Sequence, residues 1–291
     1  MAVQIYVQIP AYRDNELGAT LLDLYHRADH PEHLRTCVLW QRDDEVMPSA
    51  VAALPNLEMI EIPFSLSQGA NWARHQLQRR WQGEPYTLLL DSHHRFAPHW
   101  DTSLIEMYGQ CVARSSKPVI SAYLPDYDPA LEPYGRVQRP TKIYPSKRDH
   151  GVLVQLAGHT LPFWKALTEP APGEFVGLHF LFTAGMFNRE IRFDPNVYYL
   201  RDEVLASLQV FTWGYDVYHP HRVLGWHAYD RSSRSPHWFG RPDWHVGQDK
   251  ALADLRRVLA GAEPRQAGCL GTMRSVADFE RRAMTRLVEP R

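Results

Sequence analysis

The apolar positions of the chain fall into short continuous runs that alternate with stretches of helical periodicity. Runs rich in β-branched and aromatic residues predict buried strands at residues 3–9, 34–40, 57–62, 86–90 and 118–122. Between these runs, apolar residues recur at helical spacing, which predicts helices over residues 14–28, 67–81 and 100–114. Strands that alternate with helices build a mostly parallel sheet covered on both faces. The pattern therefore predicts an α/β fold with a Rossmann-like sheet flanked by helices.

Some residues mark the expected ends of these elements. We expect the first strand to stop at Pro10. Asp14 and Ser67 each precede a helical stretch and carry the side-chain oxygen that an N-terminal cap needs. A later helix is predicted from Asp202 to Trp213, and Gly214 follows it in the position where glycine commonly ends a helix.

The second half of the chain has a less regular pattern. Its further strand candidates are residues 152–158, 178–183 and 221–226. Residues 123–150 carry many prolines, tyrosines and basic side chains, which predicts a long loop or a hairpin over the sheet edge. Residues 230–250 are rich in Ser, Trp, Pro and His and predict a mobile or ligand-ordered loop. Since no linker splits the chain, we expect one main domain over residues 1–250, with a helical and loop extension over residues 251–291 packed on it.

Composition narrows the class of protein. Hydrophobic residues make up 44% of the chain and charged residues 22%, which excludes disorder as the main state. With 32 basic and 33 acidic residues, the net charge of -1 gives no global electrostatic argument for a nucleic-acid or membrane partner. The 3 cysteines are far apart and odd in number, which argues against a disulfide framework or a cysteine zinc site. There is no secretory signal pattern and no apolar run long enough to span a membrane, so we expect a cytoplasmic protein.

The strongest candidate for chemistry is the segment LLLDSHHRF, in which a buried strand delivers Asp91 and His93 at its carboxyl end. Ligands bind at that end of the strands in open α/β sheets. Side chains two residues apart in an extended segment point the same way, so both groups can meet one divalent cation. A carboxylate and an imidazole suit Mn²⁺, and also zinc or iron. The alternative is a strand end followed by two surface histidines.

A third metal ligand would have to come from elsewhere in the chain. His227 also stands at the end of a predicted strand. Spacing alone does not select it among the 15 histidines, and the competitors are His75, His159, His179, His219, His221, His237 and His245.

Two further segments carry side chains that suit an anionic or aromatic ligand. The first strand is followed by Tyr12 and Arg13, where a ring can stack on a base and a guanidinium can pair with a diphosphate. Arg74 stands early in its helix and can support an anion there, or it is an ordinary solvated charge. The sequence contains neither the P-loop pattern nor G-x-G-x-x-G, which argues against an NTPase or a nicotinamide dehydrogenase.

Asp202 and Glu203 open the later helix, where the helix dipole favours negative charge. This helix-dipole effect is enough to explain the presence of one of the two carboxylates. The functional alternative is that one carboxylate binds the hydroxyl groups of a sugar or an acceptor.

Several segments, taken in order, resemble the family 60 glycosyltransferases, the Skp1-type polypeptide α-N-acetylglucosaminyltransferases and their bacterial relatives. The segments are VQIPAYRDNEL, VLWQRDDE, GANWARHQLQRRWQGEPYTLLLDSHHRFAPHWD, GYDVYHPHRVLGWHAYDR and LGTMRSVADFE. The resemblance covers about residues 3–280. It implies a GT-A fold over residues 1–250 and a metal-dependent, retaining transfer of a sugar, most simply GlcNAc, from a UDP-sugar to a hydroxyl acceptor. The implied cofactor is Mn²⁺ or Mg²⁺.

The resemblance also implies roles for individual residues. The D-x-H metal motif falls on Asp91 and His93, and the C-terminal metal histidine falls on His227. The acidic pair that faces the sugar and the acceptor, and would be catalytic, falls on Asp202 and Glu203. The positions implied to bind the donor nucleotide are Pro10, Ala11, Tyr12, Arg13, Arg74, Asp91 and Ser92.

The chain departs from the family pattern in places. Arg201 stands where a glycine is expected, which bears on the identity of the sugar. The lack of a membrane anchor and of a lectin domain fits a cytosolic or bacterial enzyme. The acceptor is open and includes a protein, a glycan, a small molecule or a modified nucleobase in DNA. For the last, the local basic stretch is Arg136, Arg139, Lys142, Lys147 and Arg148, which is also explained as a solvated loop.

Two alternatives of other classes stay open at this point. The same fold can serve as a non-catalytic domain that binds a nucleotide sugar or a glycan. A metal-dependent hydrolase could use the same Asp/His cluster, although it would need more acidic ligands than the neighbouring sequence offers.

Overall fold

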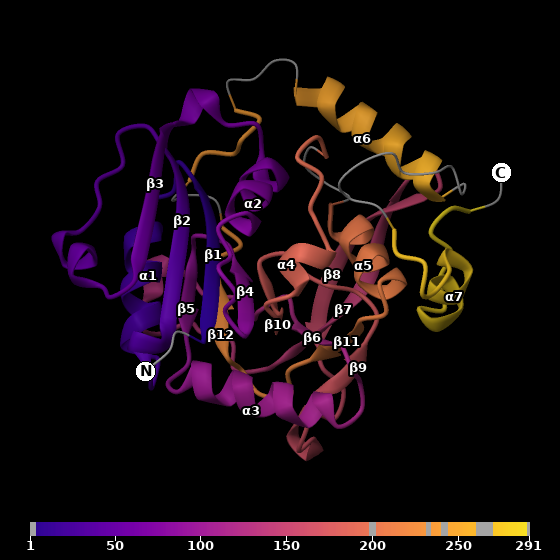
Figure 1. The fold of residues 1–291 in the computed structure, drawn as a ribbon, viewed down its shortest axis with the longest axis horizontal. Helices are drawn as coiled ribbons and strands as arrows, with labels where there is room; N and C mark the ends of the chain where they lie inside the picture. Colours follow the sequence, from indigo (N-terminus) through magenta and orange to yellow (C-terminus); the bar gives the residue numbers. More distant parts are fainter. Residues whose placement is uncertain (1–3, 198–201, 231–233, 240–243, 260–269, 290–291) are drawn as a thin grey trace.

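The chain forms one large mixed sheet with helices on both of its faces (Figure 1). The computed structural model describes residues 4–197, 202–230, 234–239, 244–259 and 270–289. The sheet has eight strands in the order β3-β2-β1-β4-β10-β6-β11-β9, and all but β10 and β9 run in the same direction. The strands are β1 Ile5–Tyr12, β2 Leu34–Arg42, β3 Leu57–Pro63, β4 Tyr86–Leu90, β6 Pro118–Ser121, β9 Ala171–Gly173, β10 Phe180–Ala184 and β11 Asp216–His219.

Two small antiparallel sheets accompany the large one. In the first, β5 (His94–Phe96) pairs with β12 (Gly225–His227), so that His227 lies opposite His94. In the second, β7 (Thr141–Asp149) pairs with β8 (Val152–Thr160) in a long hairpin. The first of these pairings matters for function, because it brings a late segment of the chain to the end of β4.

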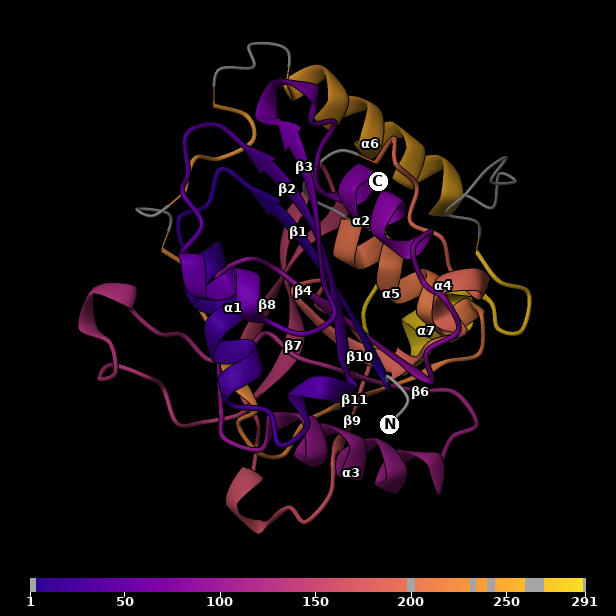
Figure 2. The same cartoon turned by 60° about the vertical axis from the view of Figure 1, so that its left-hand side comes forward.

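Helices cover the large sheet on both faces (Figure 2). Side chains of α1 and α3 share one apolar cluster with one face of the sheet, and side chains of α2, α4 and α5 pack in clusters on the other face. The helices are α1 Leu17–His26, α2 Ala70–Gln78, α3 Trp100–Val112, α4 Phe187–Glu190, α5 Asp202–Thr212, α6 Trp244–Leu259 and α7 Val276–Arg282.

Strand β1 shows why its sequence folds this way. Ile5 and Val7 point into the cluster of α1 and α3, whereas Tyr6 points to α2 and donates a hydrogen bond to the Leu77 carbonyl at 2.6 Å. A strand buried on both faces reads as a nearly continuous apolar run, and in β1 only Gln8 interrupts it. Because β1, β2 and β4 are parallel, their carboxyl ends meet at one edge of the sheet.

The predicted α/β class and the mostly parallel sheet are confirmed, but several predicted ends are wrong. Strand β1 continues past Pro10 to Tyr12 in register with β2. The residue that precedes α1 is Glu16 and not Asp14, whose side chain accepts the Glu16 amide and also contacts His93. Helix α2 is preceded by Gly69, whose φ of 107° favours glycine, and has no side-chain cap.

The second half differs more from the prediction. Residues 221–226 do not form one strand, since the chain makes β11 before them and β12 at their end. The hairpin alternative for residues 123–150 is confirmed in part by β7. The predicted loop over residues 230–250 is wrong at its end, where α6 begins at Trp244. Helix α6 also runs across residue 250, and the division of the chain there stays a prediction.

The C-terminal helix contributes one side chain to the packed interior. Phe279 of α7 is 1% exposed and packs edge-on against Phe175 and Phe211. None of the described helices is long and apolar enough to cross a membrane.

Candidate active site

A cavity of about 420 Å³ opens at the carboxyl ends of β1 and β4. It is lined by the ends of these strands, the start of α5, the middle of β8 and residues after β12. Most of the residues implicated by the sequence lie on its wall, namely Pro10, Tyr12, Arg74, Asp91, Ser92, His93, Asp202, Glu203 and His227. Segments far apart in the sequence thus meet in one place.

Asp91, His93 and His227 form the group that can hold a cation. One ligand atom from each lies within 4.8 Å of the others. The Asp91 Oδ2 atom is 3.9 Å from His93 Nε2 and 3.8 Å from His227 Nε2. Both ring nitrogens of His227 are buried without a hydrogen-bond partner among the described residues, which is costly unless another group satisfies one of them. One carboxylate and two imidazoles fit a divalent transition metal.

A buried carboxylate orients one of these ligands. The Asp14 side chain is 2% exposed, and its Oδ2 lies 2.7 Å from His93 Nδ1 and accepts a hydrogen bond from Ser92 Oγ at 2.6 Å. In the neutral tautomer that donates Nδ1–H to Asp14, the lone pair of His93 is on Nε2, on the side of Asp91. Metal-binding histidines commonly have such a partner on their second nitrogen.

The electrostatics keep the group in the protonation state that a cation requires. Burial would raise the pKa of Asp91, but the His227 ring at 3.8 Å and the charge of Arg74 outweigh it and hold that pKa well below its usual range. Burial, with the neighbouring His179, lowers the pKa of His227 well below its usual range. The carboxylate is therefore charged and the His227 imidazole neutral near pH 7, as metal ligands must be.

Arg74 links the metal group to the acidic pair. It is 6% exposed, donates to Asp202 Oδ2 at 2.9 Å and lies 3.5 Å from Asp91 Oδ1. Helix α2 supplies this residue from its buried side. The alternative of a solvated helix charge is therefore wrong for Arg74.

Glu203 is a buried carboxyl group of the cavity whose pKa is raised. Its Oε1 accepts a hydrogen bond from the Leu178 amide at 2.9 Å, and its Oε2 accepts one from the Tyr123 hydroxyl. Burial first, and then the charge of Asp202, raise the pKa of Glu203 to about 7. Perturbed carboxyl groups in a cavity are typical of functional sites.

Not every implicated residue lies on the cavity wall. Ala11 is fully buried, and its carbonyl accepts a hydrogen bond from Gln41 at 3.1 Å. Arg13 has a φ of 45° and pairs with Asp43 at 2.8 Å, while its guanidinium stacks on Phe64. Arg201 lies outside the described residues.

Asp14, Tyr123, His179 and Tyr229 are among the cavity residues that the sequence did not assign to the site. Asp14 was assigned as a helix cap, and His179 appeared only as one of many competing histidines. Tyr123 and Tyr229 carried no signal, because a tyrosine in a loop has no distinctive spacing.

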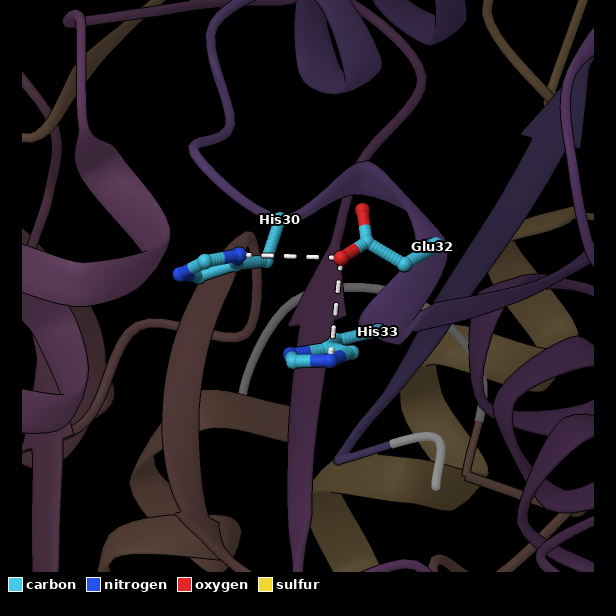
Figure 3. Close-up of side chains that lie close together, drawn as sticks. All are labelled: His30, Glu32 and His33. Carbon is cyan, nitrogen blue, oxygen red and sulfur yellow. Dashed lines mark ion pairs between the residues drawn. The ribbon is translucent and has the colours of Figure 1, made fainter. Parts of the chain in front are cut away.

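A second group of possible metal ligands lies elsewhere, before β2 (Figure 3). Glu32 Oε1 is 3.6 Å from His30 Nδ1 and 3.7 Å from His33 Nε2, and the two rings stack at 4.9 Å. These residues precede the first residue of β2, whereas the cavity lies beyond the last residues of β1. The group is therefore at the opposite end of the sheet and takes no part in the candidate active site.

Comparison with protein families decides the classification. The family model described as "Glycosyltransferase (GlcNAc)" matches residues 4–55 and 47–284, which is nearly the whole chain. The chain belongs to this glycosyltransferase family. No curated protein gives a significant match.

Solved structures agree on the fold of this glycosyltransferase. GalNAc-T7 with UDP, GalNAc and Mn²⁺ is similar with a TM-score of 0.60 at 13% identity, over 98% of this chain and 55% of that one. S. aureus TarS 1-349 is similar with a TM-score of 0.53 at 10% identity, over 87% of this chain and 80% of that one. The mannosyltransferase PcManGT from Pyrobaculum calidifontis, in complex with GDP-Man and Mn²⁺, is similar with a TM-score of 0.50 at 16% identity, over 89% of this chain and 74% of that one. These likenesses show the GT-A fold, and this chain spans about half of the GalNAc-T7 chain.

Proposed function

We propose that this glycosyltransferase transfers GlcNAc from UDP-GlcNAc to a hydroxyl group, in a reaction that needs Mn²⁺ or Mg²⁺ and retains the configuration of the sugar. The observation that carries the proposal is the group of Asp91, His93 and His227 in one cavity with Arg74. The family match supports the sugar, and the donor and metal of GalNAc-T7 support the nucleotide and the cation.

The charges on the cavity wall support a cation. Among the residues that the structure describes, the wall carries four carboxyl groups, from Asp14, Asp91, Asp202 and Glu203, and two arginines, Arg74 and Arg234. A diphosphate beside Asp91 and Asp202 would be repelled by their negative charges. Asp91, His93 and His227 would hold the cation, which supplies positive charge next to the leaving diphosphate.

The chain's own residues supply the remaining functions. Arg74 would bind the diphosphate, since its guanidinium already lies beside Asp91. Tyr12 would border the uracil ring at the end of β1. Asp202 and Glu203 would orient the sugar and the acceptor. The presence of all four residues on the cavity wall supports these roles.

The stereochemistry is proposed together with a front-face mechanism. Both oxygens of Glu203 accept hydrogen bonds, and Asp202 is paired with Arg74, so both carboxylates already have partners in the protein. A carboxylate whose oxygens are held by such partners is less available to attack the sugar. We therefore propose that the acceptor hydroxyl attacks on the face that the diphosphate leaves, and that the departing phosphate oxygen takes the hydroxyl proton.

The place of the reaction is proposed to be the cytoplasm. Cys37 and Cys111 are both buried thiols without a disulfide. Free thiols are typical of a reducing compartment.

A donor-hydrolysis assay tests the function without knowledge of the acceptor. The protein should release UDP from UDP-GlcNAc when Mn²⁺ is present, and excess EDTA should stop the release. The Asp91→Asn variant keeps the shape and loses the charge, so its UDP release should fall at least a hundredfold. Retention is checked by NMR, because α-GlcNAc should appear before its β anomer. Full activity of Asp91→Asn with EDTA present contradicts the metal site, and β-GlcNAc as the first product contradicts retention.

A further inference from the structure

His179 occupies a position in the cavity that the proposed mechanism does not use. It stands directly before β10, is 6% exposed and lines the cavity wall. Its ring centroid is 4.3 Å from that of His227 and 5.0 Å from that of Tyr123. His179 therefore lies between the metal group and the Tyr123–Glu203 pair.

The backbone fixes the tautomer of this histidine. The Leu124 amide donates a hydrogen bond to His179 Nε2 at 3.1 Å. A ring nitrogen that accepts a hydrogen bond carries no proton, so in the neutral ring the proton is on Nδ1. The arrangement makes His179 an uncharged N–H donor with a defined direction.

The donor atom has no partner within the described part of the protein. No hydrogen bond joins Nδ1 to another described residue, and the atom is not among the fully buried unpaired atoms. His179 is also outside the group of possible metal ligands, whose described members at this site are Asp91, His93 and His227. An N–H group that faces a cavity without a protein acceptor is available to a ligand.

We propose that His179 Nδ1–H donates a hydrogen bond to an oxygen atom of the donor's sugar, so that His179 is a sugar-binding residue of this transferase. The inference rests on the proposed function. We favour the sugar over the diphosphate as the partner of His179, because His179 packs against Tyr123, which donates a hydrogen bond to Glu203, a residue proposed to orient the sugar. Arg74, which is proposed to bind the diphosphate, pairs instead with Asp202. A neutral donor also suits a sugar oxygen, since it adds no charge that would hold the diphosphate after transfer.

A purely structural role of His179 predicts a different result from the binding of a sugar. If His179 serves only to accept the Leu124 amide, any side chain that provides an acceptor at the Nε2 position should replace it. Glutamine places its amide group near the position of Nε2, whereas asparagine places its amide near the position of Nδ1. The two variants therefore separate the contact with Leu124 from the contact with the sugar.

The experiment compares His179→Gln and His179→Asn by calorimetry with Mn²⁺ and either UDP-GlcNAc or UDP, and by donor hydrolysis. His179→Gln should keep the melting temperature and the affinity for UDP, while its affinity for UDP-GlcNAc falls about fivefold to tenfold, the usual effect of one lost hydrogen bond. His179→Asn should have a lower melting temperature. It should nevertheless recover part of the difference in affinity between UDP-GlcNAc and UDP. As a control, His219→Gln replaces a fully buried histidine outside the cavity and should change the melting temperature without changing either affinity.

Each other outcome overturns a stated part of the inference. Wild-type affinity of His179→Gln for UDP-GlcNAc means that His179 is only structural. An equal loss of affinity for UDP means that Nδ1 contacts the nucleotide and not the sugar. If the wild-type protein neither binds nor hydrolyses UDP-GlcNAc, the proposed function itself fails, and that result is distinct from both.

Discussion

Asp14 offers the sharpest test of how the cation group is built. In Asp14→Asn, one carboxylate oxygen becomes an amide nitrogen in a site that is 2% exposed. At present Asp14 Oδ1 accepts the Glu16 amide at 3.0 Å, and Oδ2 serves Ser92 and His93 at 2.6 and 2.7 Å. An asparagine can satisfy only one of these two sides with its single acceptor oxygen.

Both orientations of the new amide have a cost. If its NH₂ group faces the Glu16 amide, two donors oppose each other. If the NH₂ group faces His93, the Nδ1 atom must become an acceptor, and the proton moves to Nε2, where it blocks the proposed metal position. Loss of such an orienting partner typically reduces metal affinity about 10–100-fold, which corresponds to about 1.4–2.8 kcal/mol.

The assay is calorimetric titration of Mn²⁺ in the presence of UDP. A matched control is Asp101→Asn, since Asp101 is also 2% exposed and accepts two backbone amides, those of Asp29 and His30, at 2.8 and 2.9 Å. The control should lower the melting temperature without changing the affinity for Mn²⁺. Asp14 does not orient His93 for the metal if Asp14→Asn binds Mn²⁺ as tightly as the wild-type protein does. The same conclusion follows if both variants lose the same affinity for Mn²⁺.

Three further predictions test other parts of the account. With Mn²⁺ present, UDP should raise the melting temperature more than GDP or ADP does, because Tyr12 and its neighbours would select uracil; equal shifts by all three would contradict this. The raised pKa of Glu203 means that the folded state binds a proton more tightly than the unfolded state. The contribution of Glu203 to the free energy of unfolding is therefore complete below pH 4.5 and is lost as the pH rises through about 7. The Glu203→Gln variant has no carboxyl group to titrate there, so its free energy of unfolding should fall less over this pH range. Leu181→Ala should destabilise the protein by about 2–5 kcal/mol in denaturant unfolding, since Leu181 is fully buried in the sheet.

The sequence predicted most of the first half of the fold because local signals and tertiary packing agree there. Residues such as Val7 and Leu88 lie in strands buried on both sides, and these strands appear as apolar runs that only Gln8 interrupts in β1. The later strands are short, and β12 has only three residues, Gly225–His227. Its place is set by pairing with β5 and not by any periodicity of its own. A three-residue strand has too few positions for a pattern to identify it.

The site was predictable where residues sit at strand ends and unpredictable where they depend on side-chain direction. The end of β4 brings Asp91 and His93 to the cavity, as the alternation of strands and helices implied. The sequence gives no sign that β1 continues to Tyr12 or that the backbone then takes a positive φ at Arg13. The Arg13 guanidinium stacks on Phe64 and pairs with Asp43, and the next side chain, Asp14, points to His93.

The same limit explains why the supporting residues were missed while two candidate metal ligands, Asp91 and His93, were predicted. These two residues belong to one short motif with fixed spacing, whereas His227 was predicted only from the family resemblance. A supporting partner needs only to be close in space, and Asp14 lies 79 residues from His93 in the sequence. Tyr123 and Glu203 are likewise 80 residues apart. Supporting contacts of this kind are satisfied by any chain segment that the fold brings within hydrogen-bond distance, so their residues have no characteristic spacing from the motif that they support.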